Sequence, residues 1–144
     1  MASWGRLFWR AGTGMWLGVQ LLLFMGIAPT VFRTLPESQA GRFLQGLFPS
    51  YYGLGLVLGA LWLLGGVMMS SQGGHRRRWW LILLALANWL IIAWADRLLP
   101  AMNMVSASSA TFHALHQQSV ALSVVSFLLS LGGLAWESLR DFSP

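Results

Sequence analysis

Apolar residues dominate four long stretches of the sequence, and polar residues are concentrated between them. The stretches run roughly over residues 11–32, 51–70, 79–95 and 119–136. An apolar run of about 20 residues is long enough to cross a bilayer as a helix. The pattern therefore predicts an all-α fold, an integral membrane four-helix bundle that occupies residues 1–144 as a single domain.

The segment between the first and second stretches has a different pattern. Polar residues alternate there with apolar ones at helical spacing, namely Phe43, Leu44, Leu47 and Phe48. This predicts a short amphipathic helix that lies at the membrane interface and ends before Pro49. Alternatively, its polar face lines a cleft between the spans. Thr34 and Glu37 have the spacing of a capping box at the start of this helix.

The composition agrees with a membrane protein. Charged residues make up 9% of the chain, against about 25% in soluble domains, which excludes a soluble enzyme or a disordered tail. There is no cysteine, so disulfides and thiolate metal sites are excluded. All nine basic residues are arginines at the ends of apolar runs, where they anchor helices, so no nucleic-acid partner is expected.

The distribution of arginines predicts the topology. Six of them belong to the N-terminal head, the turn at residues 72–78 or the C-terminal tail: Arg6, Arg10, Arg76, Arg77, Arg78 and Arg140. The other side of the membrane would carry three, Arg33, Arg42 and Arg97. Because arginine-rich segments stay in the cytoplasm, both termini are expected to be cytoplasmic.

Small residues recur at spacings that favour close helix packing. Gly14 and Gly18 form one such pair, and Gly55 and Gly59 form another. The last apolar stretch carries a small, weakly polar stripe of Ser119, Ser123, Ser126, Ser130 and Gly133. These faces favour helix–helix contacts within the chain, in a homodimer or in a larger membrane complex. A solute path along the serines is the alternative.

Most of the remaining polar residues are expected at the non-cytoplasmic face. Four of them form a predicted polar cluster, Arg33, Glu37, Arg42 and Asp96. Charges at membrane depth are costly and tend to pair or to form a site. The cluster is therefore interpreted either as ion pairs that fix the two loops or as part of a functional site.

Soft metal ligands also occur on this side. His113 and His116 are three residues apart and share a helix face, and Met102 and Met104 precede them. Imidazole and thioether ligands without thiolate favour copper(I), with haem as a less favoured cofactor. The alternative is a structural histidine pair that hydrogen bonds to the loop. No catalytic constellation is evident, so an enzyme is not expected.

Three segments resemble the transmembrane protein 205-like family. They are Ala28-Pro29-Thr30-Val31-Phe32-Arg33, Leu47-Phe48-Pro49-Ser50-Tyr51-Tyr52 and Phe112-His113-Ala114-Leu115-His116-Gln117-Gln118-Ser119-Val120. The resemblance implies a four-span bundle in the bacterial inner membrane. It also implies a distant similarity to the copper resistance protein D group and to a four-span oxidase of haem biosynthesis.

The chain departs from this pattern in two places. Ser123 stands where an asparagine is often expected, and the first span lacks the histidine of the haem-pathway relatives. The second departure argues against porphyrin oxidation. The leading hypothesis is a small protein that binds or transports copper through His113, His116, Met102 and Met104. The second is a non-catalytic accessory subunit of a larger membrane complex, and the third, with the weakest support, is an enzyme that acts on lipid or porphyrin.

Overall fold

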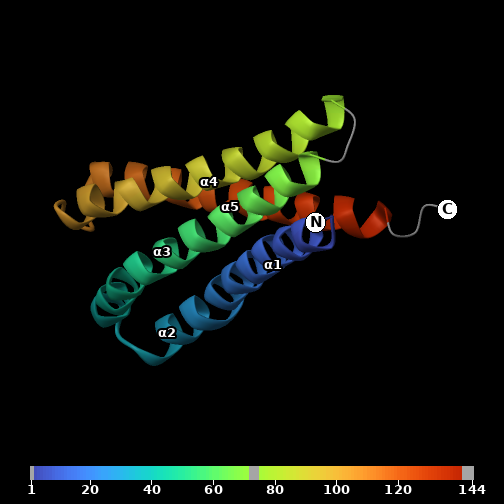
Figure 1. Cartoon of the computed structure of the whole chain (residues 1–144). Coiled ribbons are helices and arrows are strands. Elements are labelled where there is room, and N and C mark those ends of the chain that lie inside the picture. Colours follow the sequence, from blue (N-terminus) through green and yellow to red (C-terminus); the bar gives the residue numbers. More distant parts are fainter. Residues whose placement is uncertain (1, 72–74, 141–144) are drawn as a thin grey trace.

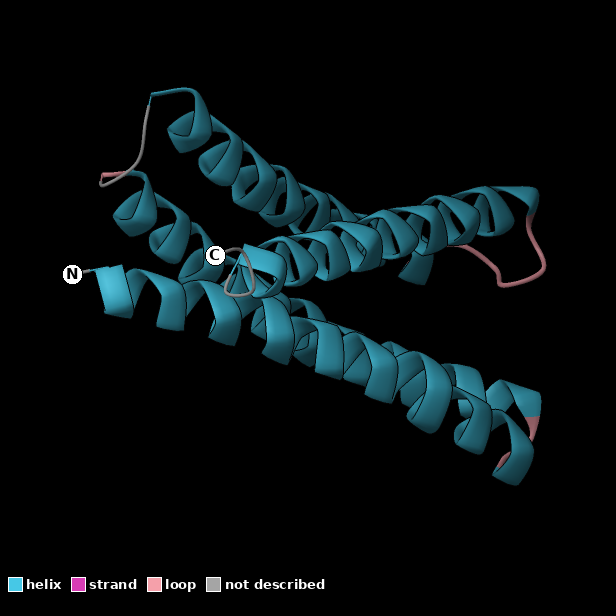
Figure 2. Cartoon of the chain, turned by 90° about the vertical axis from the view of Figure 1, so that its right-hand side faces the viewer, coloured by secondary structure: helices cyan, strands magenta, loops and turns pink. Residues whose placement is uncertain are grey.

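A computed structural model describes residues 2–71 and 75–140, except for the side chains of residues 2, 3, 75–78 and 140. The chain forms α1 (Ala2–Leu21), the π-helix η1 (Leu22–Ile27), α2 (Ala28–Thr34), α3 (Glu37–Ser70), α4 (His75–Asn103) and α5 (Ala110–Arg140). Helices account for nearly all of the described chain, and its loops lie at the ends of the bundle (Figure 2).

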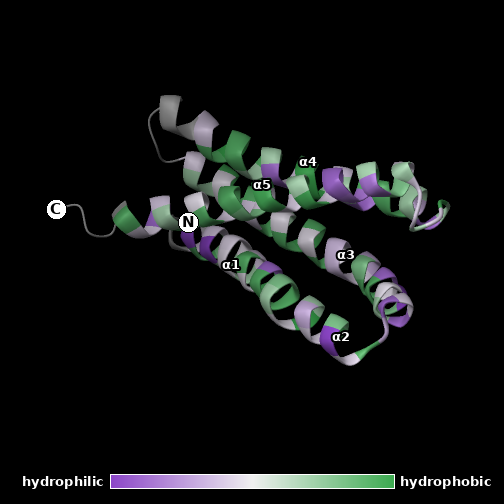
Figure 3. Cartoon of the chain, turned by 180° about the vertical axis from the view of Figure 1, so that it is seen from behind, coloured by the Kyte–Doolittle hydropathy of each residue, from purple (hydrophilic) through white to green (hydrophobic). Residues whose placement is uncertain are grey.

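Four helical stretches are long and apolar enough to cross a membrane. They are Trp4–Thr34, Glu37–Ser70, Trp79–Asn103 and Ala110–Leu139. The predicted all-α four-span membrane bundle is therefore confirmed, although each helix extends beyond the span that was predicted for it. Strongly hydrophilic residues gather at the start of α1 and around α2 and the start of α3 (Figure 3).

Neighbouring long helices run antiparallel to one another, and the four of them form a closed ring. Helix α1 packs against α3 and α5, and α4 packs against α3 and α5 (Figure 1). We call the end where α1 begins and α5 ends the terminal end, and the end with the connections at residues 35–36 and 104–109 the loop end. The turn was predicted over residues 72–78, but α4 already begins at His75. Residues 72–74 and the side chains of Arg76, Arg77, Arg78 and Arg140 lie outside the described part.

The predicted interfacial helix is not a separate element. Its residues form the first turns of α3, which continues through Pro49 to Ser70. Its apolar face is buried as expected, because Ala40 and Leu44 pack with Val31 in a small core at the loop end. The sequence could not show the continuity, since a proline usually ends or kinks a helix.

The predicted capping box is wrong. Thr34 still belongs to α2, and its hydroxyl donates a hydrogen bond to the Thr30 carbonyl over 2.8 Å. The N-cap position of α3 is Pro36, which has no side-chain hydrogen bond. The threonine therefore ends one helix instead of beginning the next.

Helix η1 interrupts the first span just before Pro29. The Ala28 N–H donates to the Leu23 carbonyl, five residues back, in the wider π register. A proline ring inside a regular α-helix collides with the carbonyl four residues back, here that of Met25. The π-helix relieves this crowding, and the chain continues as α2 without leaving the helical path.

Glycines bring the backbones of α1 and α3 together. A Cβ at Gly65 would lie 2.5 Å from the backbone nitrogen of Trp9, and one at Gly12 would lie 2.6 Å from that of Trp62. The predicted Gly55 and Gly59 face is also packed, with Gly55 against the Trp16 ring. The predicted face at Gly14 and Gly18 packs against nothing within 4 Å in the described chain.

Candidate functional site

A group of buried polar side chains lies inside the bundle, toward the loop end. Every long helix contributes to this polar centre, which consists of Trp16, Gln20, Tyr51, Tyr52, Asn88, Ser119, Ser123 and Ser126. Polar groups inside a membrane span are costly unless they find hydrogen-bond partners. The hydrogen bonds of the polar centre therefore decide what it can do.

The serines of α5 point into the bundle because of their spacing. Intervals of three and four residues place Ser119, Ser123, Ser126 and Ser130 on one helix face, and all four are buried. The predicted polar stripe is therefore confirmed as an inward face. The hydroxyls of Ser123 and Ser130 donate to carbonyls four residues earlier, so these two serines are satisfied within α5.

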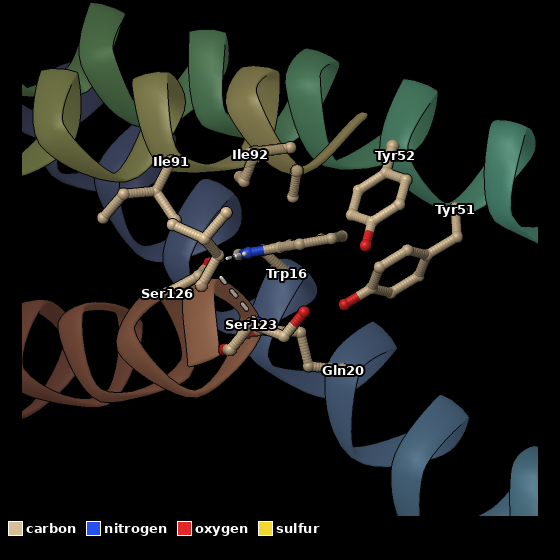
Figure 4. A pocket seen from close by; sticks show the side chains of 10 residues that line it. Trp16, Gln20, Tyr51, Tyr52, Ile91, Ile92, Ser123 and Ser126 are labelled. Atoms are coloured by element: carbon tan, nitrogen blue, oxygen red, sulfur yellow. Dashed lines mark hydrogen bonds between the residues drawn. The ribbon is translucent and has the colours of Figure 1, made fainter. Parts of the chain in front are cut away.

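Ser126 joins three helices. Its hydroxyl accepts a hydrogen bond from the Trp16 indole of α1 over 2.9 Å and donates one to Asn88 Oδ1 of α4 over 2.8 Å. The Gln20 amide nitrogen donates to the Ser123 carbonyl and, at 3.4 Å, to Ser126 Oγ. These bonds fix the positions of Trp16, Gln20 and Asn88 around one serine. Figure 4 shows Trp16 and Gln20 beside Ser126.

The two tyrosines of α3 form the other wall. The Tyr52 hydroxyl and Ser119 Oγ are 3.0 Å apart and share a hydrogen bond. The Tyr51 ring packs between Tyr52, with ring centres 5.0 Å apart, and Trp16, with ring centres 4.9 Å apart. These contacts hold the Tyr51 hydroxyl at a fixed place inside the bundle.

Three polar atoms of this centre have no hydrogen-bond partner in the described chain. They are Gln20 Oε1, the Tyr51 hydroxyl and Asn88 Nδ2. The three side chains are almost completely buried, and buried polar groups in folded proteins are nearly always paired. Trp62 Nε1 is also unpaired within the described chain, but of these four side chains Gln20 and Tyr51 are the two that line a cavity.

A small cavity lies beside Gln20 and Tyr51. Its volume is about 10 Å³, close to that of one water-sized sphere. The residues that line it are Trp16, Gln20, Tyr51, Tyr52, Ile91, Ile92, Ala95, Leu122, Ser123 and Ser126. None of these described lining residues carries a charge, so the cavity is suited to a neutral molecule.

Described residues of three helices pack tightly together on the terminal side of this cavity. The Trp9 indole donates to the Gly133 carbonyl over 2.9 Å, and the Trp9 and Trp62 rings meet edge to face at 5.5 Å. A Cβ at Gly133 would lie 2.7 Å from the Trp62 ring. Further along, Arg10 and the buried Glu137 form an ion pair at 4.0 Å.

The predicted metal ligands differ in their exposure. His113 and His116 are exposed on the first turns of α5, and each ring contacts Phe112. Met102 is buried in the hydrophobic core, whereas Met104 is 86% exposed. In the part of the chain that the structure describes, no three histidine, aspartate or glutamate residues are close enough to hold a metal ion.

The predicted polar cluster is open. Arg33, Glu37 and Arg42 are exposed and Asp96 is partly buried. These four described side chains form no ion pair with one another, whereas Arg10 pairs with Glu137. Sequence reasoning missed Gln20 and Asn88 as site residues, although an amide side chain inside an apolar span is itself a signal of an inward polar contact.

Comparisons with known proteins place the chain among uncharacterized relatives. An uncharacterized protein of Aquifex aeolicus (strain VF5) is 30% identical over 117 residues, which are 81% of this chain and 83% of the relative. No solved structure matches the chain. Residues 11–100, which include Trp16, Gln20, Tyr51, Tyr52 and Asn88, match the family model described as a domain of unknown function, DUF4149. The chain, a multi-pass membrane protein, therefore belongs to the DUF4149 family.

Proposed function

We propose that this membrane protein binds a small neutral polar ligand inside the bundle, at the polar centre, and acts as a binding or carrier protein instead of a catalyst. The observation that carries the proposal is the cavity lined by Gln20 and Tyr51, because each of these two side chains has a buried polar atom without a partner in the described chain. A polar centre that served only to hold helices together would satisfy these atoms within the protein.

The chemistry of the polar centre supports binding over catalysis. A serine nucleophile needs an adjacent base, but the Ser126 hydroxyl donates to an amide oxygen and the Ser123 hydroxyl to a carbonyl. The described residues that line the cavity include no carboxylate and no imidazole. Hydrogen bonding is therefore the interaction that this site offers to a ligand.

The position of the cavity supports access from one side. The contacts of Trp9, Trp62 and Gly133 close the bundle toward the terminal end. The excess of arginines at that end favours a cytoplasmic location for both termini, in the inner membrane of a bacterial cell. The ligand would then enter from the loop end, on the non-cytoplasmic side.

Two tryptophans provide a direct test of this access. Trp16 lines the cavity and Trp9 lies in the closed half, yet their side chains are 1% and 0% exposed and each indole donates a hydrogen bond of 2.9 Å. We expect the Trp16 indole N–H to exchange with deuterium at least about tenfold faster than the Trp9 indole N–H. This ratio is equivalent to a difference of about 1.4 kcal/mol in the free energy of opening. The measurement is indole NMR on nitrogen-15-labelled protein, with Trp16→Phe and Trp9→Phe for assignment. Equal exchange at both indoles would overturn the proposal.

Copper binding at the loop end is the second candidate function. The observation that favours it is the exposure of both His113 and His116 on one face at the start of α5, together with the exposure of Met104 in the connection that precedes this helix. The resemblance to the transmembrane protein 205-like family and the copper resistance protein D group adds to this candidate, and haem is the less favoured cofactor. Met102 would have to leave the hydrophobic core to take part.

An accessory role in a homodimer or larger complex rests on a different surface. Gly14 and Gly18 are close enough along α1 to admit another helix, and no described residue of this chain fills the space above them. Cysteine cross-linking from Met15, which is exposed between them, tests this candidate through Met15→Cys. A cross-linked dimer in native membranes would favour it, and exclusively monomeric protein would count against it.

A further inference from the structure

We infer that the cavity of the polar centre binds a single neutral hydroxyl group, which accepts a hydrogen bond from the Tyr51 hydroxyl and donates one to Gln20 Oε1. This inference names the ligand chemistry of the proposed site and so rests on the proposed function. It rests on two side chains from different helices, Gln20 and Tyr51, that point toward one another. Each has a polar atom that makes no hydrogen bond within the described chain.

The oxygen of the Gln20 amide is still able to accept a hydrogen bond. Its nitrogen donates to the Ser123 carbonyl over 3.3 Å and to Ser126 Oγ over 3.4 Å, which uses both amide hydrogens. Its oxygen, Gln20 Oε1, has no donor within the described chain. A ligand at this position must therefore donate a hydrogen bond.

The Tyr51 hydroxyl complements the amide oxygen. It is buried, makes no hydrogen bond of normal geometry within the described chain although the Gln20 side chain lies near it, and can donate one hydrogen bond. Tyr51 and Gln20 point toward one another from α3 and α1 (Figure 4). A group that accepts from Tyr51 and donates to Gln20 at the same time has the chemistry of a hydroxyl.

The size and polarity of the cavity narrow the ligand further. About 10 Å³ accommodates one oxygen atom with its hydrogens, and no charged group among the described lining residues compensates an ion. Ile91, Ile92 and Leu122 cover the remaining wall with apolar surface. Two sources fit this chemistry: a water molecule, or the hydroxyl of an apolar alcohol that enters between the helices.

Radiolytic hydroxyl-radical labelling tests for water at the site. Radicals formed from a bound water modify the side chain next to it even when that side chain is buried. Trp16 lines the cavity, whereas Trp9 and Trp62 are equally buried and do not. We expect modification of Trp16 and Tyr51 but not of Trp9 or Trp62, measured by mass spectrometry on detergent-purified full-length protein.

The variant Tyr51→Phe identifies the bound hydroxyl. It removes a hydroxyl group that has no protein partner, so the fold is expected to persist, and modification of Trp16 should be lost. The exposed Ser138→Ala serves as the control and should leave the labelling unchanged. Trp16 modification that persists in Tyr51→Phe would overturn the inference.

A second readout separates the two sources. If Trp16 is not modified in the parent protein, native mass spectrometry in the presence of 1-octanol should reveal a bound alcohol that Tyr51→Phe loses. Absence of both signals would overturn the inference. If the Trp16 indole exchanges fast but neither labelling nor bound alcohol is seen, access from the loop end stands and the hydroxyl ligand is refuted. If the Trp16 indole exchanges slowly but Trp16 is labelled, access from the loop end is refuted and the hydroxyl ligand stands.

Discussion

The backbones of Gly65 and Trp9 lie in direct contact where α3 crosses α1. A Cβ at Gly65 would come within 2.5 Å of the Trp9 nitrogen and 2.8 Å of the Gly5 carbonyl oxygen. Helices in a membrane gain stability from such close approach, because the lipid removes most of the hydrophobic drive for association. The contact also fixes Trp9 as part of the closed half of the bundle.

Substitution of Gly65 should therefore be far more damaging than substitution of an open glycine. We expect Gly65→Ala to destabilise the protein by about 1–3 kcal/mol, the range for overpacking, because backbone atoms must move. Thermal unfolding in mild detergent measures the effect. The matched control is Gly14→Ala, whose methyl group meets nothing within 4 Å. Similar unfolding temperatures for the two variants would contradict the packing.

Removal of the Ser126 hydroxyl should loosen the polar centre. Ser126→Ala deletes the hydrogen bonds to Trp16 and Asn88 that link α5 to α1 and α4. Interhelical hydrogen bonds in membrane proteins contribute about 0.6 kcal/mol on average and up to about 1.7 kcal/mol. We expect Ser126→Ala to lower the free energy of unfolding by an amount in this range. We also expect the fluorescence of Trp16 to change, measured as the difference between proteins with Trp16 and the same proteins carrying Trp16→Phe.

The control for that experiment lies on the same helix. Ser138 is exposed and its hydroxyl donates only to the Leu134 carbonyl. Ser138→Ala should change stability by less than about 0.5 kcal/mol. If Ser126→Ala were equally silent, the hydrogen bonds of the polar centre would not contribute to helix association.

The metal hypothesis predicts a change in metal content. If the loop-end histidines hold copper, purified protein should contain about one copper per chain, and His116→Ala should lose it. Elemental analysis of detergent-purified protein provides the measurement, and Gln117→Ala, at the exposed neighbouring position, is the control. Equal metal content in all three proteins would reject His116 as a ligand.

The predicted topology can be tested with single cysteines, because the natural chain has none. Ser71 is exposed at the terminal end and Ser108 is exposed at the loop end. In intact cells with a permeabilised outer membrane, a membrane-impermeant maleimide should label Ser108→Cys and not Ser71→Cys. The reverse labelling pattern would invert the orientation deduced from the arginines.

Hydrophobic patterning was sufficient to predict the number and type of the spans. It could not predict where they end, because the amphipathic start of α3 is continuous with its span through Pro49. The small-residue spacing identified Gly55 and Gly59 but not Gly12 or Gly65, which make the closest contacts with the backbone of a neighbouring helix. Local spacing cannot reveal which face of a helix its neighbour will occupy.

The candidate site was harder to predict for the same reason. The serines of α5 could be placed on one face from their spacing, but their partners Gln20 and Asn88 lie far away in sequence. His113 and His116 were singled out because of their chemistry, yet they are exposed while the convergent polar groups are deeper. Convergence of side chains from four helices depends on their packing, which one sequence does not specify.

The length of α3 has a consequence for the environment of the loop end. Its 34 residues rise about 51 Å, whereas the hydrocarbon core of a bilayer is about 30 Å thick. A typical tilt of about 20° shortens the rise only slightly, so part of α3 projects past the lipid tails. The exposed charges of Glu37 and Arg42 favour its first turns, around Ala40 and Leu44, as that part. The small core that they form with Val31 is thus stabilised by exclusion of water, while the spans below depend on close contact and hydrogen bonding. Water is therefore the solvent that drives packing at the loop end, whereas lipid surrounds the packed spans.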